Sequence, residues 1–115
     1  MINVERVYAA STHKSGKRFL VDRLWPRGMK KEKLRLDAWF KEVAPSDGLR
    51  GWYKHDPDRW EEFKRRYFAE LDQKPEVWRP ILDAARNQEV TFLYSSKEEI
   101  NNNAVALKIY LESKL

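Results

Sequence analysis

The stretch Glu89-Val90-Thr91-Phe92-Leu93-Tyr94 decides the fold, because its β-branched and aromatic residues are typical of a buried strand. A helix is expected before it over about 80–87, and the sequence leaves open whether that helix begins earlier, at Pro75. After it, the segment 96–99 has a serine and a glutamate three positions apart, which is the pattern of a capping box. The last helix is therefore predicted to begin there, so the chain ends as helix, strand, helix.

Two more strands are predicted in the first part of the chain. Apolar residues alternate imperfectly over 2–8, a polar loop is expected over 11–17, and a short apolar strand follows at 18–22. The segment 25–28 ends that strand, because it contains a proline and a glycine. The simplest packing is an α/β fold with three layers around a small, largely parallel sheet. An α+β fold with an antiparallel first pair of strands is the alternative.

Two helices are predicted between these strands and the helix expected at about 80–87. Over 35–43 the apolar residues recur at helical spacing, and a proline follows shortly afterwards. Ser46 is expected to cap a short turn. Asp56 is a good N-cap and Pro57 suits the first helical position, so the clearest helix begins here and runs to about residue 72.

Length and composition exclude several classes of protein. The 115 residues suffice for one domain over 1–115, and 42% hydrophobic and 13% aromatic residues exclude a disordered chain. There is no cysteine, no signal-peptide pattern at the start and no apolar window long enough to span a membrane, so we expect a cytoplasmic protein. The formal charge of +5 permits a polyanionic partner without requiring one, because acidic and basic residues are mixed.

The candidate functional site lies where the predicted strands end. In an open α/β sheet, ligands bind outside the carboxyl ends of the strands. Arg23 and Arg27, which follow the strand 18–22, carry permanent planar charges that suit phosphate or carboxylate. Asp22 would either hold one of these arginines or accept a substrate proton. The alternative is a local ion pair that only fixes the loop.

Residues from other segments are candidates to complete this site. Asn102 and Asn103, in the first turns of the last predicted helix, would hydrogen-bond a ligand or fix the loop, or would be structurally satisfied amides. His55 would be a general acid or base if it is functional, with a structural role as the alternative. Trp25 is either a core residue or a flat wall for a planar ligand. No metal-ligand spacing, glycine-rich phosphate loop or serine elbow occurs, and no cofactor is indicated.

Several segments of the chain resemble a known family. They are 21–28 (Val-Asp-Arg-Leu-Trp-Pro-Arg-Gly), 36–39 with 44–46, 55–57 with Trp60 and Phe63, and 93–94 with 102–105. Together they are similar to the YeaO-like branch of the DUF488 family, a family of domains of unknown function, from about residue 4 to 111.

The resemblance implies an α/β fold and brings no assigned activity. It marks as polar motif positions Asp22, Arg23, Arg27, His55, Asp56, Asn102 and Asn103. Relatives often have aspartate and histidine where this chain has Glu98 and Asn101. Either His55 is then the one histidine left in the motif here, or acid–base chemistry by histidine is lost altogether.

These observations lead to three hypotheses on function. The first is that the protein binds a small anionic ligand, such as a nucleotide or a phosphorylated metabolite. Arg23 and Arg27 would hold the anion, the two asparagines would orient it, and Asp22 and His55 would transfer protons if the protein is an enzyme. The second is a nucleic-acid-binding or regulatory module, and the third is a domain that binds a protein partner. The sequence leaves the oligomeric state open.

Overall fold

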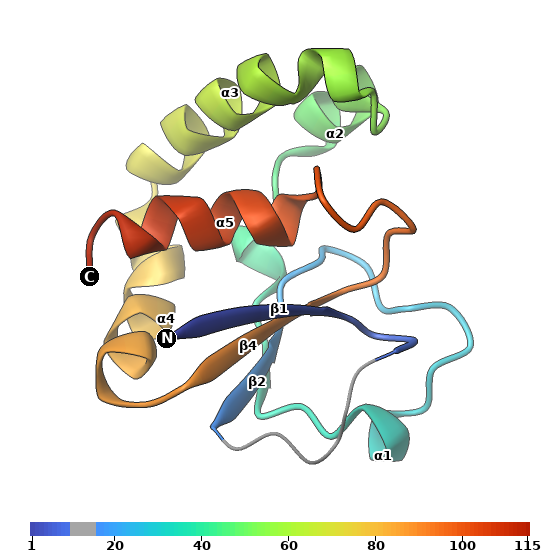
Figure 1. The fold of residues 1–115 in the computed structure, drawn as a ribbon, viewed down its shortest axis with the longest axis vertical. Coiled ribbons are helices and arrows are strands. Elements are labelled where there is room, and N and C mark those ends of the chain that lie inside the picture. Colours follow the sequence, from blue (N-terminus) through green and yellow to red (C-terminus); the bar gives the residue numbers. More distant parts are fainter. Residues whose placement is uncertain (10–15) are drawn as a thin grey trace.

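A four-stranded parallel sheet forms the centre of the computed structural model, which describes residues 1–9 and 16–115. The strands are β1 (Ile2–Arg6), β2 (Lys17–Leu20), β3 (Ala38–Trp39) and β4 (Val90–Tyr94). They lie in the order β1-β4-β2-β3 (Figure 1). Because β4 pairs in parallel with both β1 and β2, the predicted α/β fold is confirmed and the antiparallel alternative is wrong.

Helices cover the two faces of the sheet unequally. The α-helices are α1 (Lys31–Leu34), α2 (Asp47–Tyr53), α3 (Trp60–Asp72), α4 (Pro75–Asn87) and α5 (Asn103–Glu112). Two short 3₁₀ helices cover Lys41–Val43 and Pro57–Arg59. Helices α2 to α5 supply the large core on one face, whereas only α1 and its neighbouring loops pack on the other (Figure 1). The three predicted layers are present, and one of them is thin.

Strand β4 is buried on both faces, and its side chains alternate between two cores. Phe92 belongs to the large core, together with Phe19 of β2 and Tyr67 of α3. Leu93 belongs to the smaller core, together with Leu20. A continuous apolar run is typical of a parallel strand that is covered on both sides, which explains why the segment 89–94 was recognisable in the sequence.

The helix predicted over 35–43 is wrong. The backbone N–H of Asp37 donates to the carbonyl of Arg18, and that of Phe40 donates to the carbonyl of Leu20, so the segment pairs with β2 as β3. Arg35 has a φ of 51°, which ends α1 in the left-handed region. The sheet therefore satisfies backbone groups that a helix would otherwise have satisfied, and apolar spacing alone could not reveal this.

The last helix begins later than the capping-box pattern predicts. Helix α5 starts at Asn103, and the side chain of Asn102 is its N-cap, because its Oδ1 accepts a hydrogen bond from the backbone N–H of Val105. The Ser96 hydroxyl accepts from the backbone N–H of Glu98 instead, which closes a local turn. Asn102 thus lies at the N-cap, where asparagine is favourable, and Asn103 is the first residue of the helix.

The remaining helix predictions agree with the structure. Ser46 caps α2 through the backbone N–H of Leu49, and Asp56 caps the 3₁₀ turn that leads into α3. Helix α4 begins at Pro75 and continues through Pro80, which settles the alternative that the sequence left open. Most of the loop predicted over 11–17 lies outside the described residues. Within the described part of the chain, no helix is long and apolar enough to cross a membrane.

Candidate functional site

A cavity of about 470 Å³ lies where the carboxyl ends of β1, β2 and β4 meet. The chain leaves β2 toward α1 on one face and leaves β4 toward α5 on the other (Figure 1). Ligands of open α/β sheets bind at such points of divergence. Five lining residues carry a fixed positive charge, and one carries a carboxylate. The cations are Arg6, Arg23, Arg27, Arg50 and Lys97, and the carboxylate is Asp22.

Asp22 fastens together three elements beneath the cavity. Its Oδ2 accepts hydrogen bonds from the backbone N–H and the hydroxyl of Ser95, both at 2.9 Å. Its Oδ1 accepts one from Nδ2 of Asn103 at 3.2 Å. Within the described residues it forms no ion pair with Arg23 or Arg27, so the local ion pair that the sequence offered as an alternative does not form. The carboxylate joins the end of β2 to the end of β4 and to the first turn of α5.

Arg23 and Arg50 form the inner cationic side of the cavity. The Nε atoms of both are buried, and neither has a hydrogen-bond partner in the described part of the chain. Nη2 of Arg23 donates to the carbonyl of Ala44 at 3.4 Å, which is a long hydrogen bond. Asp47 contacts Nη2 of Arg50, and its Oδ1 lies 3.9 Å from Nε of Arg23. Both guanidinium groups therefore keep donor capacity for a further anion.

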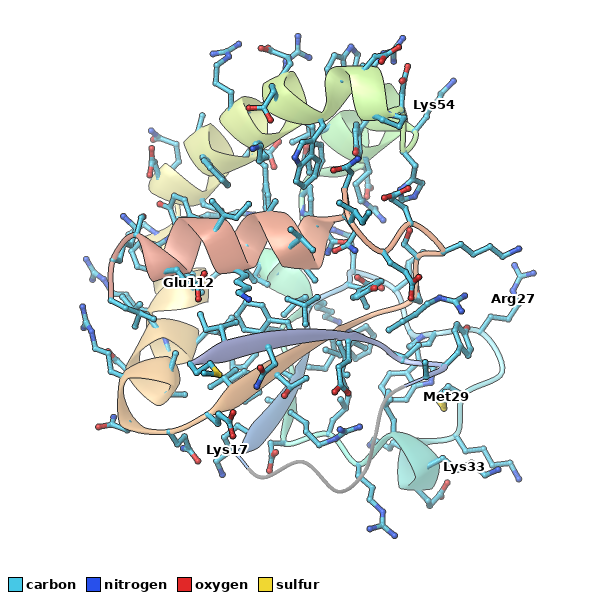
Figure 2. The ribbon with its side chains drawn as sticks, viewed as in Figure 1. Lys17, Arg27, Met29, Lys33, Lys54 and Glu112 are labelled. Atoms are coloured by element: carbon cyan, nitrogen blue, oxygen red, sulfur yellow. The ribbon has the colours of Figure 1, made fainter. Side chains whose placement is uncertain are left out.

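Of the other three cations, Arg6 is half-buried, whereas Arg27 and Lys97 are exposed. Nε of Arg6 donates to the carbonyl of Ser96 at 2.9 Å, and its guanidinium carbon lies 4.8 Å from the ring centroid of Tyr8. The Tyr8 hydroxyl donates to the carbonyl of Arg27 at 2.8 Å and so fixes that loop. The Arg27 side chain itself is exposed and projects outward (Figure 2). Among the described residues, neither Arg27 nor Lys97 forms an ion pair.

Trp25 packs against the smaller core and also lines the cavity. Its role as a flat wall for a planar ligand stays a prediction. Its Nε1 donates to the carbonyl of Met29 at 2.7 Å, and its ring meets that of Trp39 edge-on at 5.5 Å. Nε1 of Trp39 donates to the carbonyl of Asp22 at 2.7 Å. These hydrogen bonds fix the orientation of both indoles beside the cationic residues.

His55 lines the same cavity from the loop after α2, where it is exposed and has a φ of 56°. Its ring lies 6.0 Å from that of Tyr53, whose hydroxyl donates to the carbonyl of Asn101 at 2.8 Å. Burial first, and then the charges of Glu98 and Asp56, raise the pKa of Tyr53 to about 12. Within the described residues, no three histidine or carboxylate side chains lie close enough to share a metal ion.

The two asparagines have different places in the structure. Asn102 is fully buried, its Nδ2 donates to the carbonyl of Glu98 at 2.8 Å, and its oxygen caps α5. It does not line the cavity. Asn103 does line it, and its Nδ2 donates to the carbonyl of Val21 at 3.3 Å as well as to Asp22. The structure therefore brings Asn103 to the candidate site and places Asn102 beneath it.

Glu98 closes the turn that leads into α5. Its Oε1 accepts hydrogen bonds from the backbone N–H groups of Asn101 at 2.9 Å and Ile100 at 3.1 Å. These two bonds, and to a smaller extent the charge of His55, hold the pKa of Glu98 below its ordinary value.

Replacing Glu98 with glutamine should reduce stability at neutral pH and matter less in acid. Because the pKa of Glu98 is lower in the folded protein, its charged form stabilises the fold above the unfolded pKa of about 4.3. This contribution is lost as the pH falls through the folded pKa. Urea unfolding of wild type and Glu98→Gln at several pH values measures it, with Glu99→Gln as the control. A stability difference that stays constant from pH 7 to pH 3 would contradict this origin.

The basic run at 64–66 does not extend the cationic cavity. Lys64 pairs with Glu61 at 2.9 Å, and both Arg65 and Arg66 hydrogen-bond Glu62. These hydrogen bonds lower the pKa of Glu62 to about 2. The run is therefore an ion-paired outer face of α3.

Sequence reasoning missed three of the five cations in the cavity. Arg6 ends β1, Arg50 lies on α2, and Lys97 follows β4. Arg6 and Lys97 could have been found from the rule already used, since each lies at the carboxyl end of a strand. Arg50 carries no such signal, because only the packing of α2 beside the strand ends brings it to the cavity.

Comparison with known proteins places the chain in a family. A family model described as the inactive DUF488-N3 subclade matches residues 1–115. The chain belongs to this subclade of DUF488. The predicted family resemblance is thereby confirmed. No solved structure matches the chain.

Two bacterial relatives of this DUF488 chain are similar to it over different lengths. Uncharacterized protein YeaO of Escherichia coli is 41% identical over 112 residues, which are 97% of each chain. Uncharacterized protein Rv3073c of Mycobacterium tuberculosis is 49% identical over 70 residues, 61% of this chain and 59% of that protein.

Proposed function

We propose that the cavity binds a small organic anion, such as a nucleotide or a phosphorylated metabolite. The observation that carries the proposal is the charge of the lining, where five cations face one carboxylate. That carboxylate, Asp22, directs its oxygens to Ser95 and Asn103, and the lining keeps a net positive charge. An anion with several acceptor oxygens suits the guanidinium groups best, because each presents donors in a planar fork.

The size of the cavity supports a ligand larger than a lone inorganic ion. Its volume of about 470 Å³ lies in the range of about 300–1,000 Å³ that is usual for small-molecule sites. The fixed ring of Trp25 offers an apolar surface to an organic part of the ligand. The cytoplasmic location expected from the sequence belongs to the same proposal.

The proposed activity is binding without turnover. The family description as an inactive subclade supports this. Asp22 is engaged in fastening the strand ends, and His55 is exposed at the rim with no hydrogen bond to it among the described contacts. Proton transfer by these two residues stays a prediction from the sequence, as do the nucleic-acid and protein-partner hypotheses.

A ligand screen on wild type and one variant tests the proposal. Nucleoside monophosphates, sugar phosphates and a short DNA duplex are compared by thermal shift, since a ligand that binds only the folded state raises the Tm. Replacing Arg27 with alanine should weaken binding of the best phosphate compound by about tenfold, because one charged contact is lost. The Arg27 side chain is exposed, so the fold should be unaffected.

Arg79→Ala is the matched control, since Arg79 is an exposed arginine on α4 outside the cavity and its loss changes the net charge equally. If both variants bind the ligand equally weakly, the loss comes from the lower net charge of the protein and not from a contact of Arg27. If no small phosphate compound shifts the Tm of the wild type, the proposal fails, and a shift with DNA alone would favour the nucleic-acid hypothesis.

A further inference from the structure

Two carboxylates stand beside the inner arginines without lining the cavity. Asp47, the first residue of α2, contacts Nη2 of Arg50, and its Oδ1 lies 3.9 Å from Nε of Arg23. Glu42 lies 3.9 Å from Nη1 of Arg23. The inner arginine pair is therefore partly neutralised from outside the cavity, whereas Arg27 and Lys97 have no such carboxylate among the described residues.

Asp47 is the one of these two carboxylates that acts on both arginines. Its side chain is 82% exposed, and within the described residues it accepts no hydrogen bond from the backbone. The N-cap of α2 is Ser46, which accepts from the backbone N–H of Leu49, so the capping hydrogen bond of this helix does not involve Asp47. Its main contacts are thus to the two cations that face the cavity.

We propose that Asp47 is a selectivity residue that sets how much negative charge the cavity accepts, favouring a phosphate monoester over a di- or triphosphate. This inference rests on the proposed function of the cavity. Asp47 lowers the positive potential at Arg23 and Arg50, and it repels the ligand in proportion to the ligand's own charge. A phosphate monoester loses little binding by this repulsion, whereas a polyphosphate loses more.

The repulsion is moderate, because Asp47 is exposed and water screens it. Two unit charges about 6 Å apart in water interact strongly enough to change a binding constant by about threefold. Removing Asp47 should therefore raise the affinity for the ligand, and each additional negative charge on the ligand should multiply this gain by about three.

The experiment compares inorganic phosphate and pyrophosphate as probes on wild type, Asp47→Asn and Asp83→Asn. Asp83→Asn is the matched control, because Asp83 forms the same type of pair with an arginine three positions later on α4, at 3.8 Å, away from the cavity. Dissociation constants are measured by calorimetry at low salt and pH 8, where pyrophosphate carries about one more negative charge than phosphate. The Tm of each free variant checks its folding.

Asp47→Asn is expected to bind both anions more tightly, and the gain for pyrophosphate should exceed the gain for phosphate by about threefold. Asp83→Asn should change neither affinity. An equal gain for both anions, or no gain, would overturn the selectivity role while leaving the cavity a binding site. Failure of the wild type to bind either anion, together with failure of the organic phosphates above, would remove the proposed function itself.

Discussion

Replacing Asp22 with alanine is expected to lower the free energy of unfolding by about 3 kcal/mol, because three hydrogen bonds to one charged group are lost. The Ser95 backbone N–H would then lack its partner in a partly buried position, and Nδ2 of Asn103 would keep only its hydrogen bond to the Val21 carbonyl. The ends of β2 and β4 and the start of α5 would come apart at the floor of the cavity. Urea denaturation of wild type and variant measures the change.

Asp58→Ala is the control for this prediction, since Asp58 is exposed and its side chain makes no hydrogen bond among the described residues. A change below about 1 kcal/mol in Asp22→Ala would mean that water replaces the carboxylate at little cost. A stable Asp22→Ala protein that no longer binds the anion would instead assign Asp22 to ligand contact and contradict its role as a fastener.

Replacing Gly16 with alanine is expected to destabilise the protein by about 3–4 kcal/mol, through a strained backbone and a close contact. Gly16 has a φ of 90°, and a Cβ placed there would lie 2.2 Å from the carbonyl oxygen of Glu89. That carbonyl accepts a hydrogen bond from the backbone N–H of Lys17, so it cannot move away without disturbing the start of β2. Thermal and urea unfolding measure the loss.

Two other glycines separate the strain from the contact. Gly28 has a φ of 75° with open space around the missing side chain, so Gly28→Ala reports strain alone and should cost about 1 kcal/mol. Gly51 lies in α2 with open space and an ordinary φ, so Gly51→Ala should stabilise the protein by about 0.5–1 kcal/mol. If Gly16→Ala is as stable as Gly28→Ala, the backbone moves the added Cβ away from the Glu89 carbonyl oxygen at no cost in stability.

Composition and capping residues are enough to predict those strands and helices whose conformation depends on neighbouring residues in the sequence. The segment 89–94 has the composition of a strand covered on both faces, and Asp56 with Pro57 caps the turn before α3. The segment 35–43 carries an equally regular apolar pattern, yet β2 draws its backbone into the sheet. The pairing of β2 with β3 joins residues that are distant in sequence, so no pattern within the segment 35–43 could have predicted it.

In the candidate site, too, some residues could be placed from the local sequence and others only from the packing of the fold. Asp22, Arg23, Trp25 and Arg27 lie together because they follow one strand, and the rule on strand ends predicts their place. The role of Asn102 could not be predicted while α5 was expected to start at Ser96, because its capping function depends on where the helix begins. Asp47 likewise gains its place from the packing of α2, not from its neighbours in sequence.

The position of β4 in the sheet also shapes how the protein is made. β4 is an inner strand, between β1 and β2, yet it follows the other three strands of the sheet in the chain, and its register joins Val90 with Ile2 and with Lys17. β1 and β2 therefore have no partner in common until β4 has been synthesised. Folding must wait for this long-range pairing, which places the protein among slower folders for its size. Before β4 is made, β1 has no partner and β2 can pair only with β3, so strand edges stay exposed that promote aggregation.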